Sequence, residues 1–168
     1  MTTDTPSRFR HTRQDTALIH GLSTSEVQLL QQSCVEARSR AYCPYSKFQV
    51  GCALLLNNDE VVIGANVENA AYPVGTCAER VAIGTAVVQG AKKGDIRAIA
   101  VSTGISPPAS PCGMCRQFIR EFCELSTPIM MFDKDGRSTT LTLEQLLPMS
   151  FGPDQLATTE DVQLTTGS

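Results

Sequence analysis

Three cysteines and one glutamate are the residues whose spacing points most directly to chemistry. Cys77 and Glu79 stand two positions apart where one predicted helix begins, and Cys112 and Cys115 stand three apart where another begins. Because residues three apart share a helix face, Cys112 and Cys115 can bind one ion together. Cys77 and Glu79 can converge on the same point only if Cys77 occupies the helix cap, so that both side chains extend from the open end.

This set of residues predicts a catalytic zinc site. Three thiolates leave one position of a tetrahedral zinc ion open, which separates a catalytic site from a structural one. A carboxylate that is not a ligand, such as Glu79, can then take a proton from water. Arg80 is expected to donate to a ligand sulfur without binding the metal itself. Together with the two positive helix N-termini, it would offset the negative charge of three thiolates. Zinc deaminases acting on nucleobases carry these motifs in this order, with His or Cys as the first ligand.

Plainer interpretations of the same residues stay open on the motifs alone. Cys112 and Cys115 could form a redox dithiol or one corner of a structural zinc knot, and Glu79 could simply stabilise the dipole of its helix. Both histidines, His11 and His20, lie in the polar N-terminal segment, which disfavours a histidine-based site. The remaining cysteines lack motif spacing and are expected to be small buried hydrophobic residues: Cys34, Cys43, Cys52 and Cys123.

The elements that must position these residues follow from periodicity and turn signals. A capping box at Ser23 and Glu26 begins a helix over 24–40, and apolar positions at helical spacing continue it. The other predicted elements are a hairpin of strands 48–56 and 61–67, a helix over 77–89, a strand over 96–102, a helix from Pro111, a hairpin of strands 128–132 and 139–143, and a short helix over 144–147. This order predicts an α/β fold with three α-β-α layers around one five-stranded mixed sheet. The helix over 77–89 is apolar nearly all round, which predicts burial on all sides and a subunit interface.

Composition sets the class of protein. The chain has 168 residues, is 42% hydrophobic and carries a formal net charge of −3, so we expect one globular domain with no surface built for nucleic acid. No apolar run is long enough to cross a membrane, and the N-terminus lacks the apolar region of a secretory signal. Seven cysteines without such a signal indicate a reducing compartment, here the cytoplasm. We expect a disordered extension over 1–21, a catalytic domain over 22–155 and a flexible tail over 156–168.

Several longer motifs resemble one known family. They are residues 42–48 (YCPYSKF), 64–70 (GANVENA), 77–80 (CAER), 110–117 (SPCGMCRQ) and 144–152 (EQLLPMSFG). Together they resemble the small homotetrameric zinc-dependent cytidine deaminases over about residues 22–155. The resemblance implies hydrolytic deamination of cytidine and 2′-deoxycytidine to uridine and 2′-deoxyuridine, with release of ammonia, in pyrimidine salvage.

The resemblance also implies a role for each matching residue. Cys77, Cys112 and Cys115 would hold one zinc ion per subunit, while Glu79 would move protons to and from the cytosine ring. The residues that would contact the substrate are Phe48 on the pyrimidine, Asn66 and Glu68 on the ribose, Ala78, and Tyr72 and Phe151, which reach the site from neighbouring subunits of a homotetramer. The expected partner is a small nucleoside, with no nucleic acid and no membrane.

Other interpretations of the binding residues and of the whole chain remain. By alternation with Val50, Phe48 could be plain core, and Asn66 and Glu68 could be a solvated strand edge. The substrate could be another cytosine compound, such as a nucleoside antibiotic or deoxycytidylate, although a carboxylate at Glu68 would repel phosphate. An RNA-binding zinc module is a rival of a different class, against which the low pI of about 5.4, the few aromatic residues that look exposed and the lack of a basic run all count.

Overall fold

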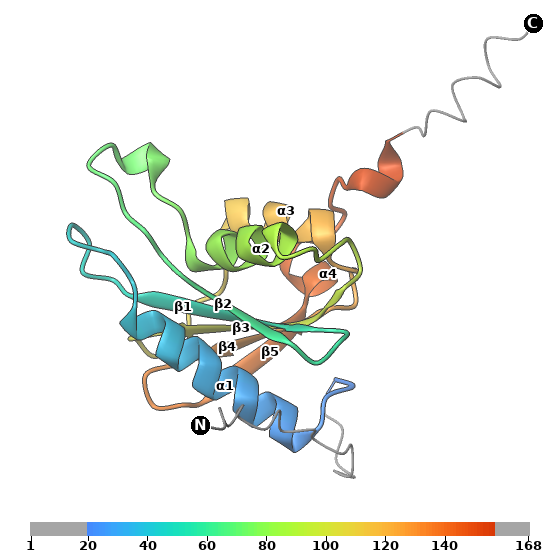
Figure 1. Ribbon diagram of the computed structural model, residues 1–168, viewed down its shortest axis with the longest axis horizontal. Helices are drawn as coiled ribbons and strands as arrows, with labels where there is room; N and C mark the ends of the chain where they lie inside the picture. The colour runs from blue at the N-terminus through green and yellow to red at the C-terminus, as the bar shows by residue number, and fades with distance from the viewer. Residues whose placement is uncertain (1–19, 157–168) are drawn as a thin grey trace, which may run out of the picture.

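One mixed sheet with helices on both faces organises the chain in the computed structural model, which describes residues 20–156 (Figure 1). The predicted N-terminal extension and C-terminal tail lie almost wholly outside the described residues. The elements in chain order are α1 (Thr24–Ser39), β1 (Val50–Leu56), β2 (Val61–Ala65), η1 (Tyr72–Val74), α2 (Ala78–Val88), β3 (Ile96–Thr103), α3 (Gly113–Phe122), β4 (Pro128–Phe132), β5 (Ser138–Thr142), α4 (Leu143–Leu146) and η2 (Pro153–Gln155).

The five strands lie in the order β2-β1-β3-β4-β5. The two predicted hairpins, β1–β2 and β4–β5, are antiparallel, as is the pair β1–β3. Only β3 and β4 run parallel within this described sheet, and α3 makes the crossover that a parallel pair requires. Helix α1 covers one face, while α2, α3 and α4 cover the other (Figure 1). The prediction of a three-layer α/β fold with a five-stranded mixed sheet is therefore confirmed.

Two hydrophobic clusters separate the layers and fix the helices in place. On the face of α2 and α3, buried residues such as Ile83, Ile99 and Ile119 join both helices to the central strands. On the other face, Leu30 and Cys34 of α1 pack on the opposite side of the same strands. Because α2 and α3 bury their apolar faces against one sheet surface, their N-termini are brought to the same edge of the molecule.

Local signals placed most elements within two residues of their predicted bounds. The capping box of α1 is present, with the Glu26 backbone N–H donating to Ser23 Oγ and the Ser23 N–H donating to Glu26 Oε2. Strand β1 begins at Val50 rather than at residue 48, and β2 ends at Ala65 rather than at residue 67. In the single chain, Val88 at the C-terminal end of α2 is 89% exposed, so burial of this helix on all sides would need a second subunit and stays a prediction. None of the helices described is long and apolar enough to cross a membrane.

Two glycines allow the helices to approach the sheet closely. A Cβ atom at Gly51 of β1 would lie 2.0 Å from the carbonyl oxygen of Cys34 and 2.3 Å from the backbone nitrogen of Arg38, both in α1. A Cβ atom at Gly64 of β2 would lie 2.4 Å from the backbone nitrogen of Ala82 in α2. Both positions therefore exclude a side chain, since the atoms that would clash belong to the backbone of a packed helix.

Replacing Gly51 with Ala is expected to lower the free energy of unfolding by about 1–3 kcal/mol, because α1 must shift away from the sheet to accept one methyl group. Gly104→Ala is the matched control, since its Cβ would meet nothing within 4 Å. Urea unfolding followed by circular dichroism compares the two variants. Equal stability of Gly51→Ala and the wild-type chain would contradict the close approach of α1 to β1.

Candidate functional site

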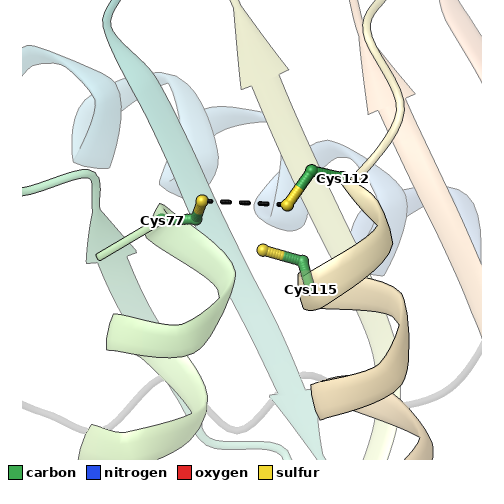
Figure 2. A group of neighbouring side chains, drawn as sticks. All are labelled: Cys77, Cys112 and Cys115. Carbon is green, nitrogen blue, oxygen red and sulfur yellow. Dashed lines mark hydrogen bonds between the residues drawn. The ribbon is translucent and has the colours of Figure 1, made fainter. Parts of the chain in front are cut away.

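The N-termini of α2 and α3 carry the three cysteines that the sequence singled out. Cys77 is the N-cap of α2, Cys112 is the N-cap of α3, and Cys115 lies in the first turn of α3. Neither N-cap side chain forms a capping hydrogen bond, so both sulfur atoms are available to bind something else. Figure 2 shows the three side chains directed toward one another across the space between the two helices. The cap position of Cys77 is the one that convergence requires.

The spacing of the sulfur atoms suits a zinc ion. Cys77 Sγ and Cys112 Sγ lie 4.0 Å apart, and all three Sγ atoms lie within 4.8 Å of one another. In a tetrahedral site with Zn–S bonds of about 2.3 Å, neighbouring sulfur atoms lie about 3.8 Å apart. Within residues 20–156, no fourth His, Cys, Asp or Glu joins the group. The donor set therefore fits zinc with one position left for water.

The surroundings of the cysteine group shift the pKa values of Cys77 and Cys115 in opposite directions. Hydrogen bonding from Cys115, and to a lesser extent from Cys112 and Arg80, lowers the pKa of Cys77 to about 5 despite its partial burial. The pKa of Cys115 is raised, first by its interaction with the Cys77 sulfur and then by burial and the charge of the nearby Glu79 carboxylate. The thiolate form of Cys77 is thus favoured at neutral pH, and metal binding must displace the proton of Cys115.

Glu79 lies beside the cysteines as a buried carboxyl group. Its side chain is in the first turn of α2 and the residue is only 3% exposed. The Cys115 thiol donates to Glu79 Oε2 at 3.4 Å. Burial raises the pKa of Glu79 above its ordinary value, and the charge on Cys77 raises it further. A carboxyl group whose pKa is shifted toward neutrality can both accept and release a proton, as general acid–base catalysis requires.

Arg80 lies between the cysteines and the loop that precedes them. Its Nη2 donates to the carbonyl oxygen of Gly75 at 3.1 Å, and its positive charge helps to lower the pKa of Cys77. Its Nε is buried and has no hydrogen-bond partner in the part of the chain that the structure describes. Arg80 is therefore placed to act on the sulfur of Cys77, and its predicted support of a zinc ligand remains a prediction.

Residues of two loops line a cavity of about 320 Å³. One loop precedes β1 and the other, which contains η1, connects β2 to α2. The lining residues are Tyr45, Ser46, Glu68, Asn69, Tyr72 and Gly75. Gly75 lies two residues before Cys77, so this wall of the cavity is within about 7 Å of the α2 N-cap along the chain. One lining residue of the cavity is thus close to the α2 N-cap, whereas none of the three cysteines lines it.

Glu68 brings a fixed negative charge to this cavity. Its Oε2 accepts from the backbone N–H groups of Tyr45 at 2.9 Å and Ser46 at 3.2 Å, and its Oε1 accepts from the Ser46 hydroxyl. The Ser46 hydroxyl, followed by these two amides, holds the pKa of Glu68 below its ordinary value. Among the predicted binding residues, Tyr72 lines the cavity together with Glu68, and its ring centroid lies 5.7 Å from that of Tyr45.

Asn66 and Phe48 are placed differently from Glu68. Asn66 Nδ2 donates to the carbonyl oxygen of Phe48 at 2.9 Å, and Asn66 Oδ1 accepts from the backbone N–H of Val50 at 2.8 Å. The Asn66 amide therefore ties the start of β1 to the end of β2. Phe48 is 38% exposed, so the structure excludes the interpretation that it is plain core. Neither residue is among those that line the cavity, and their contacts with a substrate remain predictions.

Ala78 and Phe151, the other predicted substrate contacts, differ in their burial and in their distance along the chain from the cysteines. Ala78 is fully buried in the first turn of α2, beside the cysteines. Phe151 follows α4, is 59% exposed and is not a lining residue of the cavity. The Phe151 carbonyl oxygen accepts from Gln117 Nε2 at 3.0 Å, which fixes its backbone to α3.

The structure also adds residues that the sequence did not single out, and it corrects two expectations. Tyr45 and Ser46 line the cavity, and the only signal for them was their place in the YCPYSKF motif. Cys43 is half-buried rather than buried, because it lies in the loop before β1. The expectation of few exposed aromatic residues is wrong, since the following are exposed: Tyr42, Tyr45, Phe48, Tyr72 and Phe151.

Comparison with known proteins places this arrangement in context. Residues 24–131 match the model of the "Cytidine and deoxycytidylate deaminase zinc-binding region". The chain is 40% identical to a cytidine deaminase of Halalkalibacterium halodurans over 77% of this chain and 96% of the relative. It is 41% identical to a cytidine deaminase of Sporosarcina psychrophila over 79% and 96%. A crystal structure of cytidine deaminase from Burkholderia pseudomallei superimposes with a TM-score of 0.72 at 38% identity, covering 74% of this chain and 98% of that one.

Proposed function

This chain belongs to the cytidine and deoxycytidylate deaminase family, so it is a hydrolytic deaminase, and we propose that it converts cytidine and 2′-deoxycytidine to uridine and 2′-deoxyuridine with release of ammonia. The observation that carries the proposal is the convergence of three cysteine sulfur atoms beside the buried Glu79. A redox dithiol explains neither the third sulfur nor the buried carboxyl group. A four-ligand structural knot lacks its fourth donor within the described residues.

The residues that hold the metal are Cys77, Cys112 and Cys115. A zinc ion bound there supplies Lewis acidity that makes a water molecule reactive at neutral pH. The positive N-terminal ends of α2 and α3 both point at the three thiolates and stabilise their negative charge. Arg80 adds a full positive charge beside Cys77 and is proposed to moderate the basicity of that sulfur.

Glu79 moves the protons of the reaction. Its carboxylate takes a proton from the attacking water and delivers it to N3 of the cytosine ring, which makes C4 a better electrophile. Glu79 then takes the second proton of that water from the hydroxyl group added at C4 and transfers it to the amino group, so that ammonia leaves as the C4 carbonyl forms. The burial of Glu79 supports this role, because a raised pKa brings the acid and base forms closer in free energy near neutral pH.

The cavity favours a nucleoside over its monophosphate. Among the residues that the structure describes, its lining includes the carboxylate of Glu68 and no lysine or arginine side chain. A carboxylate can accept a hydrogen bond from a sugar hydroxyl, whereas it repels a phosphate group. We therefore assign Glu68 to the sugar, with Phe48 on the pyrimidine and Asn66, Ala78, Tyr72 and Phe151 as the other proposed contacts.

An absorbance assay with cytidine, 2′-deoxycytidine and their 5′-monophosphates, run with and without a zinc chelator, tests the proposal. We expect turnover of both nucleosides, loss of turnover with the chelator, and little turnover of the monophosphates. A preference for a monophosphate would show that the substrate is a nucleotide and would contradict the proposed nucleoside specificity. Full activity after chelation and verified metal removal would overturn the zinc mechanism.

Glu68→Ala is expected to lower kcat/KM for cytidine by about 10- to 100-fold, the usual effect of losing a hydrogen bond to a charged group. The loss should appear mainly in KM, because the sugar is remote from the reacting carbon. Glu60→Ala is a matched control, since Glu60 is an exposed carboxylate in the turn between β1 and β2. Unchanged kcat/KM in Glu68→Ala would remove Glu68 from the substrate site.

Assembly and cell location belong to the same proposal. We propose a homotetramer whose sites are completed by Tyr72 and Phe151 of neighbouring subunits, with a catalytic domain over 22–155. Exposed apolar side chains on α2, such as Val88, support an interface on that helix. A cytoplasmic location agrees with unpaired cysteines throughout the chain, because a reducing compartment keeps thiols free.

A further inference from the structure

The loop before β1 donates several hydrogen bonds to the Glu68 side chain, which lines the cavity. Glu68 accepts from three donors there: the backbone N–H groups of Tyr45 and Ser46 at Oε2, and the Ser46 hydroxyl at Oε1. A carboxylate has about four acceptor positions, so these donors leave about one of them free. The direction of that free position depends on how the three donors hold the carboxylate plane.

Ser46 is the one donor of the three that acts through its side chain. Its hydroxyl oxygen accepts from the backbone N–H of Phe48 at 3.0 Å, so its single proton is directed to Glu68 Oε1. The left-handed backbone of Lys47, with φ of 57°, turns the chain so that the Phe48 N–H faces back toward Ser46. Ser46 therefore joins the carboxylate of Glu68 to the backbone that carries the Phe48 ring.

The hydroxyl also lies at the surface that a substrate would meet. Ser46 and Glu68 both line the cavity, and Ser46 is exposed in the single chain. Without the hydroxyl, Glu68 Oε1 would lose its fixed partner, and the carboxylate could rotate or bind water instead. Two backbone amides would still hold Oε2, so removing the hydroxyl should change the orientation of the carboxylate without releasing it.

We propose that Ser46 is a positioning residue that orients Glu68 so that its remaining acceptor position meets a sugar hydroxyl of the substrate, an inference that rests on the proposed nucleoside function. Ser46 need not touch the reacting atoms for this role. Its effect should therefore depend on whether the substrate has the sugar hydroxyls that Glu68 would bind. This dependence separates positioning of Glu68 from a general role in folding the loop.

The experiment compares cytidine with 2′,3′-dideoxycytidine, which lacks the two ring hydroxyls of the sugar, in the wild-type chain and in Ser46→Ala. We expect kcat/KM for cytidine to fall about tenfold in Ser46→Ala, mostly through KM, and kcat/KM for the dideoxy compound to change by less than about twofold. Ser46→Thr, which keeps the hydroxyl, should restore activity on cytidine. In a Glu68→Ala background, Ser46→Ala should add almost nothing further.

Several results would overturn the inference. Equal losses on both substrates would show that Ser46 acts through the loop fold or through Phe48 rather than through Glu68. Full activity of Ser46→Ala, or failure of Ser46→Thr to restore activity while melting like the wild-type chain, would also contradict it. An active wild-type enzyme with any of these results leaves the proposed function intact, whereas a wild-type chain that converts neither cytidine nor 2′-deoxycytidine overturns both.

Discussion

Glu79→Gln is expected to bind zinc as the wild-type chain does and to lose at least about 10²- to 10⁴-fold in kcat, the contribution of a well-placed general acid–base group. The amide has nearly the same shape as the carboxyl group and fits the same buried position in the first turn of α2. It can neither take a proton from water nor give one to the cytosine ring. The loss should therefore fall on kcat, with KM for cytidine little changed.

Metal content and thermal melting are the companion measurements for Glu79→Gln. Burial raises the pKa of Glu79 in the folded metal-free chain, so the stability that this group contributes is fullest below its unfolded pKa and declines as the pH rises through its folded pKa. The amide of Glu79→Gln has no proton to lose, so its contribution to stability does not fall as the pH rises. At neutral pH the metal-free variant should therefore melt at the same temperature as the wild-type chain or higher. Glu144→Gln, at an exposed carboxylate of α4, is the matched control. Retained turnover in a well-folded, zinc-loaded Glu79→Gln protein would contradict the assigned role.

The second large effect is expected from Cys112→Ser, which should reduce bound zinc to near zero and abolish deamination. Cys112 is exposed, so its replacement leaves the core untouched while removing one of three sulfur donors. The loss should exceed the roughly 10- to 100-fold cost of removing an outer hydrogen-bond partner of a metal ligand. Added zinc should restore a chelated wild-type enzyme and leave Cys112→Ser inactive.

Cys43→Ser is the matched control, because Cys43 is a free cysteine outside the group of three. It should retain both zinc and activity. X-ray absorption at the zinc edge should report three sulfur neighbours and one lighter atom in the wild-type protein. Four sulfur neighbours, or an unaltered metal content in Cys112→Ser, would indicate a closed structural site in place of a catalytic one.

The secondary-structure elements and the candidate zinc ligands could be predicted from the sequence, because both depend on local signals. The capping box at Ser23 and Glu26 begins α1, and alternating or continuous apolar runs mark the strands. The two short cysteine motifs stand where helices begin, and cap geometry alone lets Cys77 extend from the open end of α2. Each of these signals depends on residues within a few positions of one another.

The surroundings of the site depended on contacts between segments far apart in the chain. Asn66 and Glu68 look alike in the sequence, as polar residues on one strand-end face, yet the Asn66 amide ties β1 to β2 while Glu68 lines the cavity. No local sequence pattern predicts the hydrogen bond between Ser46 and Glu68, because the two residues are 22 positions apart. Alternation could not place Phe48 either, since β1 begins after it and leaves it exposed.

The sequence by itself determined the chemistry: three soft donors, one acid, and the helix starts that present them. Only the tertiary structure decided that the starts of α2 and α3 lie side by side (Figure 2), and that residues of the loops before β1 and after β2 line one cavity. The physical reason is that periodicity records which face of an element is buried but not which other segment covers it. Packing on one shared sheet surface makes that choice, and the positions of the cysteines and of Glu68 follow from it.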